Sequence, residues 1–148
     1  MAIVSCLVDT NILLRLTRRS DPYYSDISSS VGKLAAQGAI LHYCHQNIAE
    51  LWNAMTRPAD RNGLGLTLKE AQRQAETIES GMFLLPDSRE TYLEWRRLVV
   101  EKSIVVVRVH DARLAACMHV HGVRHILTMN VSDFARFTEV IALHPQSI

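Results

Sequence analysis

Four acidic residues in this sequence are candidates for metal-dependent chemistry. Asp9 directly follows the apolar run 3–8, and Glu50 lies one turn into the helix expected after a second apolar run. Asp111 opens a later helix, and Asp133 follows another apolar run after a short turn. Carboxylate oxygens are the ligands that Mg²⁺ and Mn²⁺ prefer, and such a cation offsets the repulsion between clustered carboxylates. These residue types therefore indicate a metal site with an open face for hydrolysis.

The elements that must position these acids follow from the apolar pattern. The predicted strands are residues 3–8, 39–44, 83–85, 126–129 and 140–143. Residues 104–109 are left unassigned. Strands that alternate with helical segments predict an α/β fold, in which helices cover both faces of a mainly parallel sheet and residues 1–148 form one domain. Ligands of such sheets bind at the carboxyl ends of the strands, where strand order places Asp9, Glu50 and Asp133.

Each acid also has a purely structural interpretation. Asp9 and Asp111 could each be the N-cap of a helix, because a side-chain oxygen there accepts hydrogen bonds from free backbone N–H groups. Glu50 could be an exposed helix residue, and Asp133 could belong to an Asx-turn. Spacing alone leaves these alternatives open.

The composition limits the class of protein. With 148 residues, 48% of them hydrophobic and 21% charged, the chain can bury a core of one domain. Its 16 basic and 15 acidic residues give no general basic field for nucleic acid. Cys6, Cys44 and Cys117 are odd in number and far apart, and neither close pair of histidines has ligand spacing, which argues against disulfides and a zinc site. We expect a cytoplasmic protein, because no signal peptide or membrane-spanning stretch is present.

Four stretches of the chain resemble the PIN domain, and within that family the VapC-like toxin ribonucleases. They are "LVDTNILL", "IAELWNAMTRP", "NGLGL" and "HDARLAACMHVHGVRHILTMNVSDFARF", in the family's order and across nearly the whole chain. The last stretch is the most specific, because T-x-N-x-x-D-F follows D-A-x-L-A-A at the usual separation. The resemblance implies a single PIN-like domain with a five-stranded parallel sheet, and a ribonuclease that depends on Mg²⁺ or Mn²⁺.

The resemblance also implies roles for particular residues. The catalytic and metal-binding carboxylates would be Asp9, Glu50, Asp111 and Asp133. The supporting polar positions would be Thr10, Asn11, Thr128 and Asn130.

The sequence departs from the family at one place. Related sequences usually have a polar or glycine-containing loop before the D-A-x-L motif, whereas this chain has "SIVVVRVH". That run could form an extra strand, or an apolar loop packed under the site or against a partner. Together with Tyr23, Tyr24, Trp52 and Met55 it is a candidate for apolar surface that a monomer would expose, so we expect a homodimer.

Further partners and rival functions follow from the same resemblance. The implied partners are an RNA substrate and an antitoxin protein whose tail would place a basic side chain among the carboxylates. The alternatives are a stand-alone PIN nuclease, a non-catalytic PIN-like module that binds RNA or protein, and a phosphatase or DNA nuclease that uses similar acids.

Overall fold

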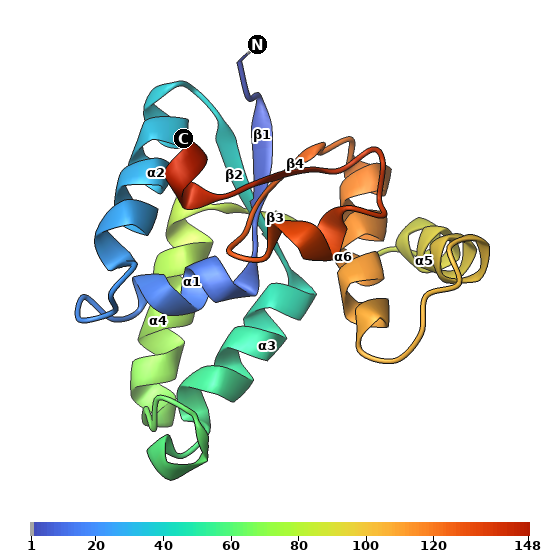
Figure 1. Cartoon of the computed structure of the whole chain (residues 1–148). Helices are drawn as coiled ribbons and strands as arrows, with labels where there is room; N and C mark the ends of the chain where they lie inside the picture. The colour runs from blue at the N-terminus through green and yellow to red at the C-terminus, as the bar shows by residue number, and fades with distance from the viewer. Residues whose placement is uncertain (1) are drawn as a thin grey trace.

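Five short strands form one parallel sheet in the computed structural model, which describes residues 2–148 (Figure 1). The strands are β1 (Ser5–Val8), β2 (Ile40–Cys44), β3 (Phe83–Leu85), β4 (His125–Leu127) and β5 (Ile141–Leu143). Their order across the sheet is β3-β2-β1-β4-β5, and every neighbouring pair is parallel. The α/β prediction is confirmed, and the predicted strands differ from the observed ones only at their ends.

Helices cover both faces of the sheet. They are α1 (Thr10–Leu16), α2 (Tyr24–Ala36), α3 (His45–Thr56), α4 (Leu68–Gly81), α5 (Arg89–Glu101) and α6 (Arg108–His121), with short 3₁₀ turns η1 (Ala59–Arg61), η2 (Val131–Phe134) and η3 (Pro145–Ser147). Figure 1 shows α2 and α4 on the opposite side of the sheet from α5 and α6. Within residues 2–148, no helix combines the length and the apolar character that a membrane span requires.

The alternation of side chains along β1 explains the two layers. Cys6 and Val8 are buried in one core cluster with residues of α1 to α4, whereas Leu7 is buried in a second cluster with residues of α5 and α6. Successive side chains of a strand point to opposite faces, so a continuous apolar run is expected for a strand buried on both sides. Burial on both faces holds β1 in place at the centre of the sheet. Asp9 directly follows its last residue, so the position of Asp9 is fixed as well.

The candidate site lies where the strand order changes direction. From β1 the chain proceeds to β2 and β3 on one side of the sheet and later returns to β4 and β5 on the other. The backbone N–H of Asp9 donates to the carbonyl of Leu127 (3.0 Å), which holds the carboxyl ends of β1 and β4 together. Ligands of open α/β sheets bind in the crevice at such a switch point.

The unassigned run before α6 is a loop that passes into the helix and not an extra strand. Ile104 is buried, whereas Val105, Val106 and Val107 are 66%, 78% and 69% exposed. Val106 has φ = 49°, a backbone region that a β-branched residue rarely adopts. Because α6 begins at Arg108, Asp111 lies in the first helical turn, and the interpretation of Asp111 as an N-cap is wrong.

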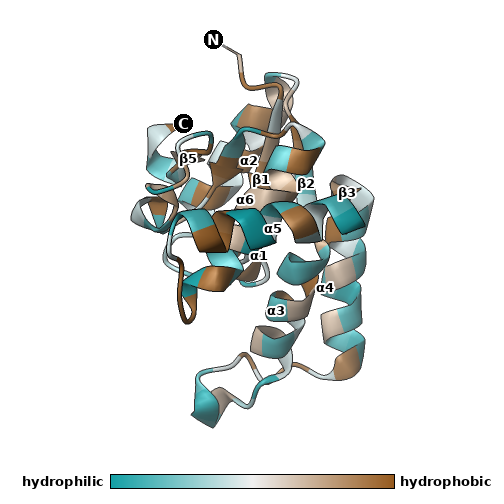
Figure 2. Ribbon diagram, turned by 90° about the vertical axis from the view of Figure 1, so that its right-hand side faces the viewer, coloured by the Kyte–Doolittle hydropathy of each residue, from teal (hydrophilic) through white to brown (hydrophobic). Residues whose placement is uncertain are grey.

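The prediction of exposed apolar residues is correct only in part. Tyr23 is 41% exposed, but Met55 is fully buried in the cluster beneath α3, and Trp52 packs against the same cluster. Of the predicted apolar surface, the run Val105 to Val107 is exposed near the candidate site. In Figure 2, α5 faces the viewer and an apolar loop continues from its end.

Candidate active site

Asp9 stands at the carboxyl end of the central strand and is only 8% exposed. Its extended backbone (φ −69°, ψ 155°) ends β1, and its Oδ1 accepts a hydrogen bond from the N–H of Thr10 (2.8 Å). Asp9 is thus the N-cap of α1, as the structural interpretation predicts. Its second oxygen, Oδ2, accepts hydrogen bonds from other side chains, which a helix cap does not require.

A polar network from the end of β4 holds that second oxygen. The hydroxyl of Thr128, which is fully buried, donates to Asp9 Oδ2 (2.8 Å), and Asn11 Nδ2 lies 3.3 Å from the same oxygen. Asn11 Oδ1 in turn accepts from the N–H of Met129 (3.1 Å). Asn130 joins through its backbone N–H, which donates to Thr128 Oγ1 (3.1 Å). The predicted supporting residues therefore fix the position of one carboxylate between two strands.

Thr10 is oriented from α3. Its Oγ1 accepts from Asn47 Nδ2 (3.1 Å), while Asn47 Oδ1 accepts from the backbone N–H of Cys44 (2.9 Å). Asn47 is fully buried at the start of α3. It therefore ties the end of β2 to the start of α1.

All four predicted carboxylates line one cleft of about 640 Å³. Its lining residues are Asp9, Gln46, Ala49, Glu50, Val107, Arg108, His110, Asp111, Arg113, Leu114 and Asp133. The acids come from four places: the end of β1, the second turn of α3, the first turn of α6, and η2. The structure therefore brings together the four acids that the sequence singles out, at one edge of the sheet.

A basic side chain contacts two of these acids. Arg108 NH1 lies 2.5 Å from Asp133 Oδ1 and 3.3 Å from Asp111 Oδ2. These two carboxylates hold the pKa of Arg108 above its ordinary value, with Asp133 as the larger cause. Arg108 is therefore a cation of the chain itself that partly neutralises the acidic cleft.

Gln46 organises the side of the cleft that carries Glu50. Gln46 Nε2 donates to Glu50 Oε1 (2.6 Å) and to the backbone carbonyl of His110 (3.0 Å). Gln46 Oε1 is buried and has no hydrogen-bond partner among residues 2–148. A buried acceptor without a partner indicates that a further donor or cation completes this side of the cleft.

The electrostatics of the cleft favour the binding of positive charge. Burial raises the pKa of Asp9 to about 6, the hydrogen bonds from Thr128 and Thr10 oppose this rise, and the carboxylates of Glu50 and Asp111 add to it. Burial is also the main cause that raises the pKa of Asp111, and Arg108 opposes it. Carboxyl groups that ionise with difficulty because of burial and like charge are stabilised by a cation bound between them.

The donor chemistry fits a hard divalent cation, but the side chains are not grouped around one. Oxygen ligands, an open cleft and the free Gln46 Oε1 are suited to Mg²⁺ or Mn²⁺. Across residues 2–148, however, no three Asp, Glu, His or Cys side chains are grouped closely enough to hold an ion. Arg108 bridges two of the acids, so these side chains must separate from it before both can bind a metal.

Three residues of the site were not found from the sequence. Gln46 and Asn47 open a predicted helix, and Arg108 lies in the unassigned run 104–109; nothing in their spacing separates them from solvent-facing positions. For Gln46 and Asn47 a usable signal was their place shortly after the predicted strand 39–44, where side chains meet the edge of the sheet.

The sequence matches the PIN domain family over residues 6–140, and the chain belongs to this family. No curated protein is similar enough in sequence to count as a match.

Solved structures share the fold at low sequence identity. VapBC-1 from nontypeable Haemophilus influenzae has a TM-score of 0.70 at 15% identity, covering 97% of this chain and 99% of that chain. VapBC2 from Rickettsia felis, bound to a DNA fragment from its promoter, has a TM-score of 0.69 at 14% identity, covering 95% and 98%. VapC20 from Mycobacterium tuberculosis, a toxin that cleaves the sarcin–ricin loop, has a TM-score of 0.59 at 15% identity, covering 82% and 86%. At these identities the likeness concerns the fold.

Proposed function

We propose that this protein is an endoribonuclease that depends on Mg²⁺ or Mn²⁺ and hydrolyses RNA phosphodiester bonds. The observation that carries the proposal is the cleft in which Asp9, Glu50, Asp111 and Asp133 meet, with the buried Asp9 held by the hydroxyl of Thr128. Membership of the PIN family and the fold shared with a toxin that cleaves the sarcin–ricin loop support it.

We assign a catalytic role to each acid from the family resemblance, and the shared cleft supports the assignment. Asp9 and Asp111 would be the central ligands of the metal, and Asp133 would be a second ligand, directly or through water. Glu50, which Gln46 orients, is a further ligand or holds the attacking water. When bound, the metal activates that water and stabilises the charge that develops on the phosphate.

The supporting residues act on the acids and not on the substrate. Thr128 and Asn11 donate to Asp9 Oδ2 and so keep one carboxylate rotamer fixed. Thr10 contributes its N–H to Oδ1 and is itself held by Asn47. Polar groups that orient a metal ligand in this way raise metal affinity by about 10–100-fold.

Cleavage assays with matched variants test the proposal. We expect wild-type protein to cut single-stranded RNA with Mn²⁺ and to lose activity in EDTA. Asp111→Asn should abolish cleavage, because an amide keeps the shape but loses the charge, whereas Asp60→Asn on the exposed η1 should cut at the wild-type rate. Parallel assays with single-stranded DNA and a phosphomonoester separate the DNA nuclease and phosphatase alternatives. RNA cleavage that persists in chelator, or that survives Asp111→Asn, rules out the metal site.

We further propose that the nuclease is the toxin of a type II toxin–antitoxin pair and acts in the cytoplasm. Several structures with this fold are complexes named VapBC or toxin–antitoxin. The antitoxin would place a basic side chain among the cleft carboxylates, in competition with the metal. The contacts of Arg108 with Asp111 and Asp133 support this, because they are an example of a basic side chain that pairs with these carboxylates.

The exposed apolar loop supports a homodimer. The run Val105 to Val107 lies beside the cleft, to which Val107 contributes, and a second copy of the chain would cover it. Sedimentation of wild type against Val106→Asp tests this: the variant should be monomeric at concentrations at which the wild type is a dimer. A monomeric wild type contradicts the dimer.

Expression in a bacterial host separates the toxin from the alternatives. Growth arrest that needs Asp111, and that a small gene adjacent to the coding sequence relieves, supports the toxin. An active nuclease that does not slow growth is a stand-alone PIN nuclease. A protein that binds RNA in the presence of Mn²⁺ but never cuts it is the non-catalytic module.

A further inference from the structure

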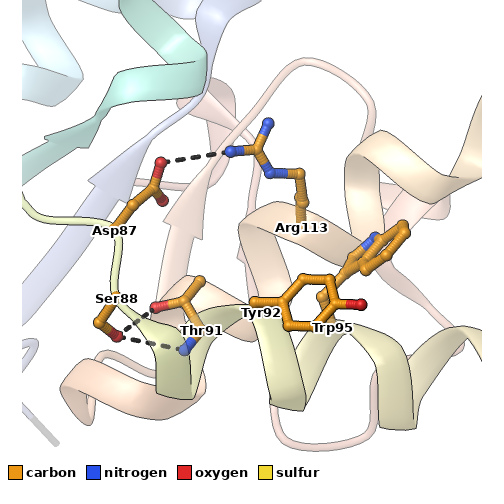
Figure 3. A pocket seen from close by; sticks show the side chains of 6 residues that line it. All are labelled: Asp87, Ser88, Thr91, Tyr92, Trp95 and Arg113. Carbon is orange, nitrogen blue, oxygen red and sulfur yellow. Dashed lines mark hydrogen bonds and ion pairs between the residues drawn. The ribbon is translucent and has the colours of Figure 1, made fainter.

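A second pocket adjoins the acidic cleft and shares one side chain with it. The pocket measures about 270 Å³ and is lined by Asp87, Ser88, Thr91, Tyr92, Trp95 and Arg113 (Figure 3). Arg113 also lines the acidic cleft, so the two spaces meet at its side chain. The catalytic roles proposed above use none of these six residues.

One wall of the pocket is an aromatic pair with an exposed ring. Tyr92 is 53% exposed, and its ring centroid lies 6.2 Å from that of Trp95 at an interplanar angle of 36°. Trp95 is anchored, because its Nε1 donates to the carbonyl of Val109 in the first turn of α6 (2.9 Å). An exposed ring that rests on a fixed one is an ordered surface on which a planar group can stack.

The opposite end of the pocket is charged. Arg113 NH2 donates to Asp87 Oδ2 (3.2 Å), and His45 Nδ1 lies 3.5 Å from the same oxygen. Figure 3 shows this Arg113–Asp87 pair at one end of the pocket and the two aromatic rings at the other. Both contacts use Oδ2, so Asp87 Oδ1 can accept a hydrogen bond from a bound molecule. Arg113 keeps further N–H groups for an anion, because a guanidinium has five.

We propose that this pocket binds one nucleobase of the RNA, next to the nucleotide whose phosphate lies in the acidic cleft; the proposal rests on the ribonuclease function above. The base stacks on Tyr92, and Arg113 donates to the phosphate that connects the two nucleotides. The volume is slightly below the range of about 300–1,000 Å³ for pockets that enclose a drug-sized ligand, which suits a single base. Single-stranded nucleic acid is held by this combination of a stacking surface and a cation along the backbone.

The polar end of the pocket gives the site a base preference. Asp87 Oδ1 is an acceptor, and adenine, cytosine and guanine carry an exocyclic amino group that donates to it. Uracil has no such group. A cytidine at this position should therefore bind more tightly than a uridine, because the amino group of cytosine can donate to Asp87 Oδ1, whereas uracil has at the same ring position a carbonyl oxygen that the carboxylate repels.

Binding of a fluorescent single-stranded oligoribonucleotide to the full chain in EDTA tests the proposal without cleavage. Tyr92→Ala should weaken binding by about 5–150-fold, the range for loss of one stacked base. Tyr92→Phe keeps the ring and should bind like wild type. Leu93→Ala is the matched control, because Leu93 is the neighbouring residue of α5, is 47% exposed and does not line the pocket.

An oligonucleotide with one abasic position separates stacking from a structural effect. With wild type, removal of the base at one particular position should weaken binding by the same factor as Tyr92→Ala, and with Tyr92→Ala the same removal should have no further effect. Losses that multiply, or a Tyr92→Ala that binds like Leu93→Ala, overturn the nucleobase site even if the protein cuts RNA. A change in oligomeric state on Tyr92→Ala, with no abasic effect, makes the pocket a protein contact and also overturns it. A wild type that neither binds nor cuts RNA refutes the proposed function itself.

Discussion

Replacing Asp9 by Asn should stabilise the metal-free protein at neutral pH while it removes activity. Asp9 is 8% exposed, and burial is the main reason that its pKa rises from the ordinary 3.8 to about 6. Between these values the unfolded chain is ionised and the folded protein is not. The unfolded state therefore binds fewer protons, and the free energy of unfolding falls as the pH rises.

The size of this effect follows from the two pKa values. The contribution of Asp9 to the free energy of unfolding is fully present below pH 3.8, where the side chain is protonated in both states. Ionisation of the unfolded chain lowers the free energy of unfolding by roughly 1 kcal/mol at pH 4.5 and by about 3 kcal/mol at pH 8. The asparagine side chain of the variant does not ionise and avoids this loss. The amide has one acceptor oxygen fewer, so the hydrogen bond from Thr128 or Asn11 is lost, at about 1 kcal/mol at every pH. Relative to wild type, Asp9→Asn should therefore gain about 2 kcal/mol between pH 4.5 and pH 8.

Urea denaturation in EDTA at these two pH values measures the gain. A gain of about 2 kcal/mol corresponds to a rise of roughly 4–8 °C in Tm for a chain of this size. Asp60→Asn, which changes an exposed acid of η1, is the control and should track wild type within about 0.5 kcal/mol at both pH values. If the stability difference between Asp9→Asn and wild type did not change with pH, the argument that burial raises the pKa of this carboxyl group would be refuted.

The other predictions concern charge, hydrogen bonding and backbone space. Arg108→Gln should tighten Mn²⁺ binding about two- to fivefold in isothermal titration calorimetry, because the guanidinium no longer competes for the acids, and weaker binding would contradict this. Thr128→Val should lower the free energy of unfolding by about 1–3 kcal/mol in urea, because the buried carboxylate of Asp9 loses the hydrogen bond that the Thr128 hydroxyl donates. Gly63→Ala should cost about 1–3 kcal/mol, because its Cβ would lie 2.0 Å from the backbone oxygen of Arg57, whereas Gly32→Ala in the open α2 should gain about 0.5–1 kcal/mol. If both glycine variants changed the free energy of unfolding by the same amount, neither the space around the new Cβ nor helix propensity would determine the effect.

The fold could be predicted because short apolar runs mark its strands, and the central strand β1 is buried on both faces. Runs 3–8 and 39–44 are short and mostly apolar, with Ser5 and His42 as the polar exceptions, and a sheet covered by helices buries such runs. Asp9 and Thr128 could then be placed together, because each follows a strand and parallel strands end at one edge.

The start of α6 could not be predicted in the same way. Residues 104–109 are mostly β-branched, so local propensity favours a strand. Ile104 is nevertheless buried and Val109 packs partly against the core, while Val105, Val106 and Val107 stay in solvent. The helix begins inside this run, at Arg108. Arg108 and Asp111, three residues apart, therefore lie on the same side of the first helical turn, and the guanidinium reaches the acids. Tertiary packing, and not local propensity, decided this part of the site.

The bond between Thr128 and Asp9 also bears on the order of protein synthesis. The two residues are 119 positions apart, and β4, the neighbour of β1 that carries Thr128 at its end, is made late. A nascent chain has Asp9 from the start, but the carboxylate has no hydroxyl to hold it until residue 128 has left the ribosome. The site that we propose as catalytic is therefore assembled only near the end of translation, and an interrupted product that stops before β4 should lack the proposed activity.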